Sequence, residues 1–243
     1  MRTALDGQAG AVLRYITNQS VSNQTVPATS PSAAPKRERR KQARPGELLE
    51  AALDLFVEKG YAATRVEEVA ARAGVSKGTL FLYFPSKEDL FKAVVRHNIV
   101  GRFVQWGEQL QQYTGSTADM LRTCCLAWWD GVGNTPASGL AKLMMSEAGN
   151  FPNLAVFYQT EVIAPAQALI RLVLERGVAS GEFRPALQVD YAVHSVISPL
   201  LFLMLAKHSG GVCDAQSQNF DPVRFIEHQL DCLLYGLCQQ GKP

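Results

Sequence analysis

The most constraining feature of the sequence is a pair of short amphipathic segments, separated by a glycine, between residues 64 and 84. In the first segment, Thr64 and Glu67 have the T-x-x-E spacing of a capping box, which marks the start of a helix. Apolar residues follow at helical spacing, at Val66, Val69, Ala70 and Ala73. The pattern predicts a short helix with one buried face, ended by the tight turn that Gly74 permits.

The second segment predicts a helix that lies against another molecule. Ser76 can cap this helix, and Pro85 stops it. Gly78 in its first turn costs about 1 kcal/mol relative to Ala, which is easiest to explain if the backbone there approaches something closely. Its inward residues are expected to be Leu80, Phe81 and Phe84. Two short helices joined in this way predict a helix-turn-helix, whose second helix enters the major groove of DNA.

A further helix is expected before this pair. An apolar stripe begins after Pro45, and Gly60 has the character of a C-terminal cap. Basic residues cluster directly before it, at Lys36, Arg37, Arg39, Arg40, Lys41 and Arg44. The net charge is only +2, but residues 1–99 hold 15 Lys/Arg against 10 Asp/Glu, whereas residues 100–243 hold 9 against 12. A charge run alone is often just solvated; beside a helix-turn-helix we expect it to follow phosphates or enter a minor groove.

The rest of the chain predicts an all-α protein. Residues 1–35 have too little apolar surface to order and are expected to be a disordered tail. Residues 36–92 would form the basic arm and the three-helix DNA-binding domain, and residues 93–243 a larger helical domain for dimerisation and ligand binding. A long fourth helix is expected to reach Trp106, and later helices are expected near 117–133, 137–149, 153–178, 188–208 and 221–239.

The stretch from Glu47 to Val95 resembles the N-terminal domain of the TetR family of bacterial repressors. Matching elements include the Ala-Gly-Val-Ser turn at 73–76, Gly78-Thr79-Leu80, Tyr83-Phe84 and Ser86-Lys87-Glu88. The family commonly has Tyr at the position of Phe81, so Phe81 is expected in the core. The resemblance implies phosphate contacts from Thr64, Tyr83 and Lys87. The full set expected at or near DNA is Arg44, Thr64, Arg65, Ser76, Lys77, Gly78, Thr79, Tyr83 and Lys87.

The C-terminal half resembles AcrR-like members of the same family more weakly. The resemblance implies a homodimer interface built from the last two helices. The apolar residues that would supply it are Val193, Val196, Ile197, Leu200, Leu201, Met204, Ile226, Leu230, Leu233, Leu234 and Leu237.

The same resemblance implies a ligand cavity enclosed by helices four to seven. Aromatic and methionine residues gather there, although such residues are individually more often plain core, and two polar residues could orient a ligand. The set expected at the cavity is Phe103, Trp106, Trp128, Trp129, Met144, Met145, Phe157, Tyr158, Glu161 and His194. The effector is therefore expected to be small and hydrophobic or aromatic.

These features favour a ligand-responsive transcriptional regulator, a repressor that a hydrophobic effector releases from a palindromic operator. An architectural nucleic-acid binder and an enzyme on a helical scaffold are the alternatives, but no Walker, G-x-G-x-x-G or H-E-x-x-H motif is present. No catalytic, metal or cofactor site is expected, because the four histidines do not pair with a cysteine or histidine at metal-ligand spacing. Five irregularly spaced cysteines and the lack of an uncharged membrane-length run favour the cytoplasm, with no membrane partner.

Overall fold

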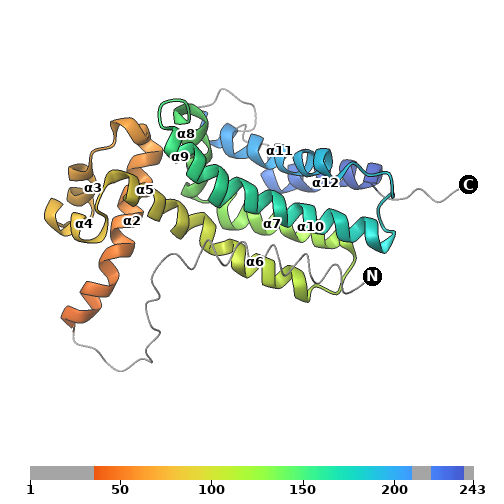
Figure 1. The fold of residues 1–243 in the computed structure, drawn as a ribbon, viewed down its shortest axis with the longest axis horizontal. Helices are drawn as coiled ribbons and strands as arrows, with labels where there is room; N and C mark the ends of the chain where they lie inside the picture. Colours follow the sequence, from red (N-terminus) through yellow and green to blue (C-terminus); the bar gives the residue numbers. More distant parts are fainter. Residues whose placement is uncertain (1–35, 210–219, 238–243) are drawn as a thin grey trace, which may run out of the picture.

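The computed structural model describes residues 36–209 and 220–237, and their regular elements are all helices, which confirms the all-α prediction. Figure 1 shows two lobes. The smaller one contains α2 (Lys36–Ala63), α3 (Val66–Arg72), α4 (Lys77–Tyr83) and α5 (Lys87–Val95). The larger one contains α6 (Gly101–Gln112), α7 (Thr117–Trp128), α8 (Gly139–Glu147), α9 (Pro152–Tyr158), α10 (Ala164–Ser180), α11 (Val189–Lys207) and α12 (Pro222–Leu237).

Helix α2 starts earlier than the sequence predicted. Its backbone is helical from Lys36 and runs through Pro45, so the basic run belongs to the helix itself. The predicted end is present as a kink, because Gly60 has φ +83°, a conformation that favours glycine. The disordered tail expected at 1–35 lies outside the described residues.

Aromatic rings fix the small lobe and join it to the large one. The rings of Phe56 and Phe91 meet edge to face with centroids 5.3 Å apart, which joins α2 to α5. Tyr61 packs edge to face on Phe151, at the start of α9, at 4.7 Å. Glu147 of α8 also accepts a hydrogen bond from the Ala62 backbone N–H at 3.1 Å. The end of α2 is therefore held by residues of the large lobe.

One helical run connects the two lobes. Helix α5 continues through a π-helical turn, η1 (Arg96–Val100), directly into α6, so the run extends from Lys87 to Gln112 (Figure 1). Two more π-helical turns occur in the large lobe, η2 (Trp129–Gly133) after α7 and η4 (Gln159–Ile163) between α9 and α10; a short 3₁₀ turn, η3 (Pro136–Ser138), precedes α8. Such single π turns are often found at functional sites, and η1 packs on η4.

Helix α11 is the one described helix that is long and apolar enough to cross a membrane by length and composition. It packs against α8, α10 and α12, and seven of its residues are buried. That packing is typical of a core helix, and the helix lies where the sequence predicts one, near 188–208.

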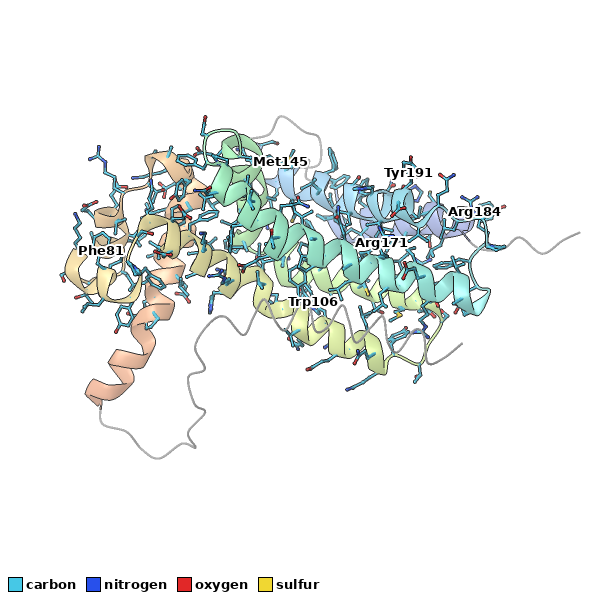
Figure 2. The ribbon with its side chains drawn as sticks, in the orientation of Figure 1. Phe81, Trp106, Met145, Arg171, Arg184 and Tyr191 are labelled. Carbon is cyan, nitrogen blue, oxygen red and sulfur yellow. The ribbon has the colours of Figure 1, made fainter. Side chains whose placement is uncertain are left out.

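The apolar residues assigned to a dimer interface are mostly buried within the protomer. Val193, Val196, Leu200, Met204, Ile226, Leu230 and Leu234 are all buried between helices of one chain. This part of the prediction is corrected, since helical periodicity shows that a face is apolar but not which neighbour covers it. The large apolar side chains left exposed on α11 and α12 are Tyr191, Phe202, Val223 and Tyr235, and Tyr191 is labelled in Figure 2.

Replacing Gly177 with alanine is expected to lower the free energy of unfolding by about 1–3 kcal/mol, the usual cost of overpacking. A Cβ at this position of α10 would lie 2.2 Å from the ring of Phe183, which is fully buried. Gly149→Ala is the matched control, because a Cβ there meets nothing within 4 Å. Urea unfolding of both variants measures the difference; equal stabilities would contradict the packing.

Candidate DNA-binding and ligand sites

Helices α3 and α4 form a helix-turn-helix whose turn is closed by backbone and cap hydrogen bonds. Gly74 has φ +66°, and the Val75 N–H donates to the Ala70 carbonyl at 2.9 Å. The hydroxyl oxygen of Ser76 accepts from the Thr79 N–H at 3.1 Å and caps α4, as the sequence predicted. The turn therefore sets α4 rigidly against α3.

The sequence around Ser76 also reads Gly-Val-Ser-Lys-Gly, the letter pattern of a hydrolase nucleophile elbow. That motif requires a strand before the turn, and here the turn joins two helices. Ser76 is occupied as a helix cap. The pattern has no catalytic meaning in this fold.

Only Leu80 of α4 is buried, so most of this helix faces outward. Lys77 and Gly78 are exposed at its start, as expected. The prediction that Phe81 lies in the core is wrong, because Phe81 is 37% exposed and projects from the α4 end of the molecule (Figure 2). Leu82, to which the sequence analysis gave no role, is 84% exposed. Apolar side chains on such a face can contact the methyl group of thymine.

Nothing inside the protein requires a glycine at position 78. A Cβ there would meet only the Ser76 hydroxyl, at 3.8 Å, and the backbone is not in the left-handed region. The helix would gain stability from a larger residue. This geometry is what we expect if the space above Gly78 is reserved for a partner.

The structure gives Thr64 and Lys87 internal roles. Thr64 is 2% exposed, and its hydroxyl donates to the Gly60 carbonyl at 2.7 Å and lies 3.1 Å from the Leu55 carbonyl. The cap of α3 is Arg65 instead, whose N–H donates to Glu68 Oε2 at 3.5 Å. The T-x-x-E box predicted at Thr64 and Glu67 is therefore not formed: only the return hydrogen bond of a capping box is present, one residue later, and the Thr64 hydroxyl binds the Gly60 carbonyl instead.

Lys87 closes the end of α2. Its ammonium donates to the carbonyls of Tyr61, Ala62 and Thr64 at 2.8, 3.2 and 3.1 Å, and it lies 4.5 Å from the Tyr61 ring centroid. Partial burial lowers its pKa, while the nearby Glu147 carboxylate opposes that shift. All three ammonium protons have partners, so a phosphate contact from Lys87 would require it to give one up.

The remaining residues expected at DNA lie on α4, at the start of α3 and on α2. Tyr83 ends α4 and is exposed, and Arg65 is exposed at the start of α3. Lys77 forms an exposed ion pair with Glu67 of α3 at 2.6 Å, and such surface pairs contribute little stability. Lys77 can therefore exchange this partner for a phosphate at small cost. Arg44 lies on the helical backbone of α2, and its side chain is outside the described set.

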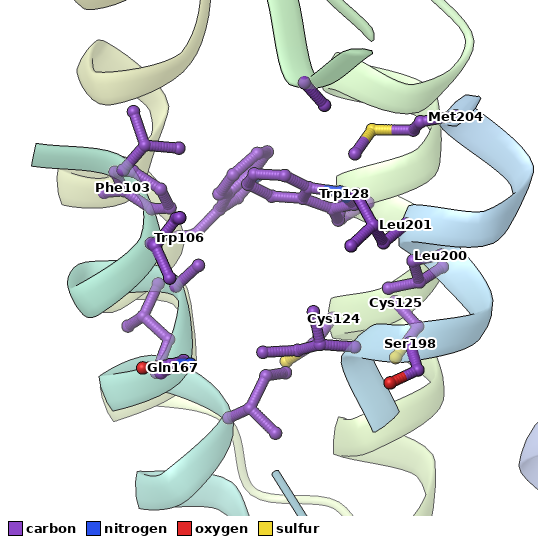
Figure 3. Close-up of a pocket in the computed structure, with 18 of the residues that line it drawn as sticks. Phe103, Trp106, Cys124, Cys125, Trp128, Gln167, Ser198, Leu200, Leu201 and Met204 are labelled. Carbon is purple, nitrogen blue, oxygen red and sulfur yellow. The ribbon is translucent and has the colours of Figure 1, made fainter. Parts of the chain in front are cut away.

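A cavity of about 490 Å³ lies inside the large lobe. Its walls come from α6, α7, α8, the run from α9 to α10, and α11. Figure 3 shows the rings of Phe103, Trp106 and Trp128 reaching into it. Phe103 stacks on Trp128 with centroids 5.9 Å apart, and Trp106 lies 5.5 Å from Trp128. This volume is within the usual range for small-molecule sites.

Seven residues expected at the cavity lie in its wall: Phe103, Trp106, Trp128, Met144, Met145, Tyr158 and His194. The structure places the other three elsewhere. Trp129 is buried in η2, against Gly133, and Phe157 packs under the side chains of Lys92 and Arg96. Both differ from their lining neighbours by one position, which turns a helical side chain by about 100°.

Glu161, expected as a polar group of the cavity, is instead locked in an ion pair. Arg96 Nε and Nη2 donate to its two carboxylate oxygens at 2.7 and 2.5 Å. Glu161 is 7% exposed, and this hydrogen bonding together with its charge raises the pKa of Arg96 despite partial burial. The pair joins η1, which follows α5, to η4, whose Gln159, Val162 and Ile163 line the cavity.

Neither of the adjacent thiols of Cys124 and Cys125 is reactive in the way that an oxidant sensor requires. Burial raises the pKa of Cys124 to about 12 and raises that of Cys125 as well, so both thiols stay protonated. The expectation that no histidine pairs with a cysteine at metal-ligand spacing is wrong. His228 Nε2 and Cys232 Sγ lie 3.7 Å apart at positions i and i+4 of α12. Among the described residues, no group of three potential metal ligands includes them.

Comparisons with known proteins agree on the family. Residues 48–94 match the bacterial regulatory proteins of the tetR family, and residues 112–215 match the tetracyclin repressor-like C-terminal domain. The HTH-type transcriptional repressor KstR2 of Mycolicibacterium smegmatis is 30% identical over 158 residues, covering 65% of this chain and 76% of that protein.

Solved structures share the fold. The transcriptional regulator FadR from Bacillus subtilis in complex with stearoyl-CoA has a TM-score of 0.56 at 20% identity, covering 79% of this chain and 98% of that one. A putative transcriptional regulator from Saccharomonospora viridis in complex with choline has a TM-score of 0.64 at 19% identity, covering 82% and 100%. With both halves matched in order, this chain belongs to the TetR family and is a DNA-binding transcriptional regulator rather than an enzyme.

Proposed function

We propose that the protein is a cytoplasmic repressor that binds a palindromic operator as a homodimer and leaves it when a small hydrophobic effector occupies the cavity. The observation that carries this proposal is the unbroken helical run from Lys87 to Gln112. Its first part packs on α2 in the DNA-binding lobe, and its second part supplies Phe103, Trp106 and Leu110 to the cavity wall. A ligand that displaces this run would move the helix-turn-helix.

The ion pair between Arg96 and Glu161 is the second connection between the two sites. It fixes the junction of α5 and α6 to the turn η4, part of which lines the cavity. An effector that shifts η4 would pull on the end of α5 through two hydrogen bonds. Because an effector can shift an equilibrium only by its differential affinity for two states, it must bind better when the recognition helices are wrongly spaced.

The homodimer is proposed from the outer face of α11 and α12. Tyr235 is 78% exposed, and Tyr191, Phe202 and Val223 are exposed as well. A second copy that pairs the same two helices would cover these side chains, as an isologous interface does. The two recognition helices would then lie about 34–36 Å apart, one turn of DNA.

Footprinting and gel shift on the DNA upstream of the chain's own gene test the proposal. We expect protection of one short, near-palindromic site at salt concentrations that abolish binding to random duplex. Gly78→Leu should keep its fold yet weaken operator binding by at least ~10-fold, because its side chain would fill the space above α4. Glu108→Leu, on an exposed position of α6, is the control.

Two results would count against this function. Uniform coating of any duplex would favour the architectural alternative. Full operator affinity in Gly78→Leu would remove the assigned recognition face.

A further inference from the structure

The described part of the cavity wall has no acidic side chain and no Lys or Arg that could form an ion pair with a ligand. Cys124, Cys125 and Tyr158 are lining groups that could become anionic, but burial raises the pKa of all three, to about 12 for Cys124. Tyr113 and His194 also line the wall. A carboxylate or ammonium placed here would lose its hydration without a Lys, Arg, Asp or Glu side chain of the wall to pair with it.

Two arginines whose contacts reach the cavity wall or the turn η4 beside it, Arg96 and Arg176, are already engaged. Arg96 is bound to Glu161 by two hydrogen bonds. Arg176 donates to the carbonyls of Tyr113 and Gly115, at 3.2 and 2.8 Å. Turning any of these groups toward a ligand would cost an existing interaction, so none of them offers a ready counter-charge.

Two hydroxyl groups of the wall, those of Thr123 and Ser198, can offer acceptors to a ligand. The hydroxyls of Thr123 and Ser198 donate to the carbonyls of Asp119 and His194 in their own helices, at 2.9 and 2.7 Å. Their oxygens are left with lone pairs for a donor from the ligand. Gln167 adds an amide, which can accept as well as donate. A bound hydroxyl group would find acceptors here.

Polar and aromatic groups occupy different parts of the cavity. Figure 3 shows Gln167 and Ser198 on opposite walls at one level, with Cys124 between them. The rings of Phe103, Trp106 and Trp128 lie at another level. A ligand with an apolar body and one polar end would match both levels at once.

We infer that the effector is an uncharged molecule with an aromatic or aliphatic body and a hydroxyl donor at one end. The regulatory role of this molecule rests on the proposed function, whereas its chemical class rests on the cavity alone. Among molecules of similar size, the cavity should therefore bind a neutral one more tightly than a charged one. It should also bind a molecule with a hydroxyl donor more tightly than one without.

Four probes that share one skeleton test this inference at pH 8: biphenyl-4-methanol, 4-methylbiphenyl, biphenyl-4-carboxylate and biphenyl-4-methylammonium. Tryptophan fluorescence and calorimetry measure their affinities for the full-length protein without DNA. We expect the alcohol to bind most tightly and the methyl compound roughly 5–10-fold more weakly, as for one hydrogen bond. Both ions should bind at least ~100-fold more weakly than the alcohol, because their charges are desolvated without a partner.

Two substitutions at Gln167 separate the contribution of the hydrogen bond from that of the missing counter-charge. In Gln167→Leu, the ratio of the affinity for the alcohol to that for the methyl compound should fall to about half of the wild-type ratio or less. Both ions should still bind much more weakly than the alcohol. In Gln167→Arg, the carboxylate should gain at least ~10-fold, because a guanidinium pairs well with it. Gln105→Leu, at an exposed position of α6 outside the cavity wall, is the control. Circular dichroism verifies that each variant is folded, and Gln167→Leu alone suffices if the arginine variant is not.

Carboxylate or ammonium binding within tenfold of the alcohol would overturn the inference. So would equal affinities of the alcohol and the methyl compound, or no binding of either neutral probe at its solubility limit. These outcomes are separate from the proposed function. An alcohol that binds but does not release the operator contradicts only the regulatory role, whereas an anion that binds and releases the operator contradicts only the chemical class.

Discussion

Replacing Glu161 with alanine is expected to lower the free energy of unfolding by about 3 kcal/mol, the lower end of the range for breaking a buried ion pair. Glu161 is buried and accepts two hydrogen bonds from Arg96, whose side chain is about one third exposed. The variant leaves the guanidinium without its partner against the apolar ring of Phe157. Urea unfolding at one fixed protomer concentration measures the change, since dimerisation makes stability depend on concentration.

A double-mutant cycle isolates the pair. Removing both charges, with Arg96→Met and Glu161→Leu, should cost much less than the sum of the single variants, because apolar groups can replace a buried pair at little cost. Glu108→Ala, at an exposed position of α6, should change the free energy of unfolding by less than about 0.5 kcal/mol. A loss that small in Glu161→Ala would show that the pair is not formed in solution.

Local signals in the sequence were sufficient for the helix-turn-helix. Ser76 and Ser86 each accept a hydrogen bond from the backbone three residues later, as cap residues at those positions should. Gly60 and Gly74 both adopt positive φ where the sequence required a break. These features are recognisable because the residues that determine them are neighbours along the chain.

Side-chain direction was less predictable than helix position. Periodicity assigned Phe81 to the core, yet in a seven-residue helix only the turn around Leu80 reaches the interior. Trp129 and Phe157 were expected at the cavity because their neighbours, Trp128 and Tyr158, have the same chemical character. A helix that is apolar on more than one face does not reveal from its pattern which face lines a cavity.

Long-range pairs could not be predicted at all. Glu161 and Arg96 are 65 residues apart, and no local pattern links an acid on one helix to a base on another. The same holds for Lys87, whose ammonium caps α2 from 23 to 26 residues away. Without the fold, each of these charges looks like a group available to a ligand or to DNA.

Effector and operator are expected to weaken each other's binding by about 5–150-fold, the range of typical allosteric coupling free energies of about 1–3 kcal/mol. Linkage makes the effect reciprocal, so the factor can be measured from either side. Biphenyl-4-methanol, or any other compound found to bind the cavity, is titrated with and without operator DNA. Equal affinities in the two titrations would show that the cavity does not control DNA binding.

Arg96→Lys should reduce this coupling while changing operator affinity of the ligand-free protein little. Lysine keeps the positive charge at the junction of α5 and α6, but it cannot make the two parallel hydrogen bonds that tie Glu161 to α5. Movement of η4 would then reach α5 through a single, more flexible contact, and we expect the coupling factor to fall at least ~3-fold. Arg171→Lys makes the same substitution in the exposed pair with Asp190 between α10 and α11, and it should leave the coupling unchanged. If both variants keep the wild-type factor, the signal reaches the recognition helix without the ion pair, through the helical run from Lys87 to Gln112 or through the contacts of α8 and α9 with the end of α2.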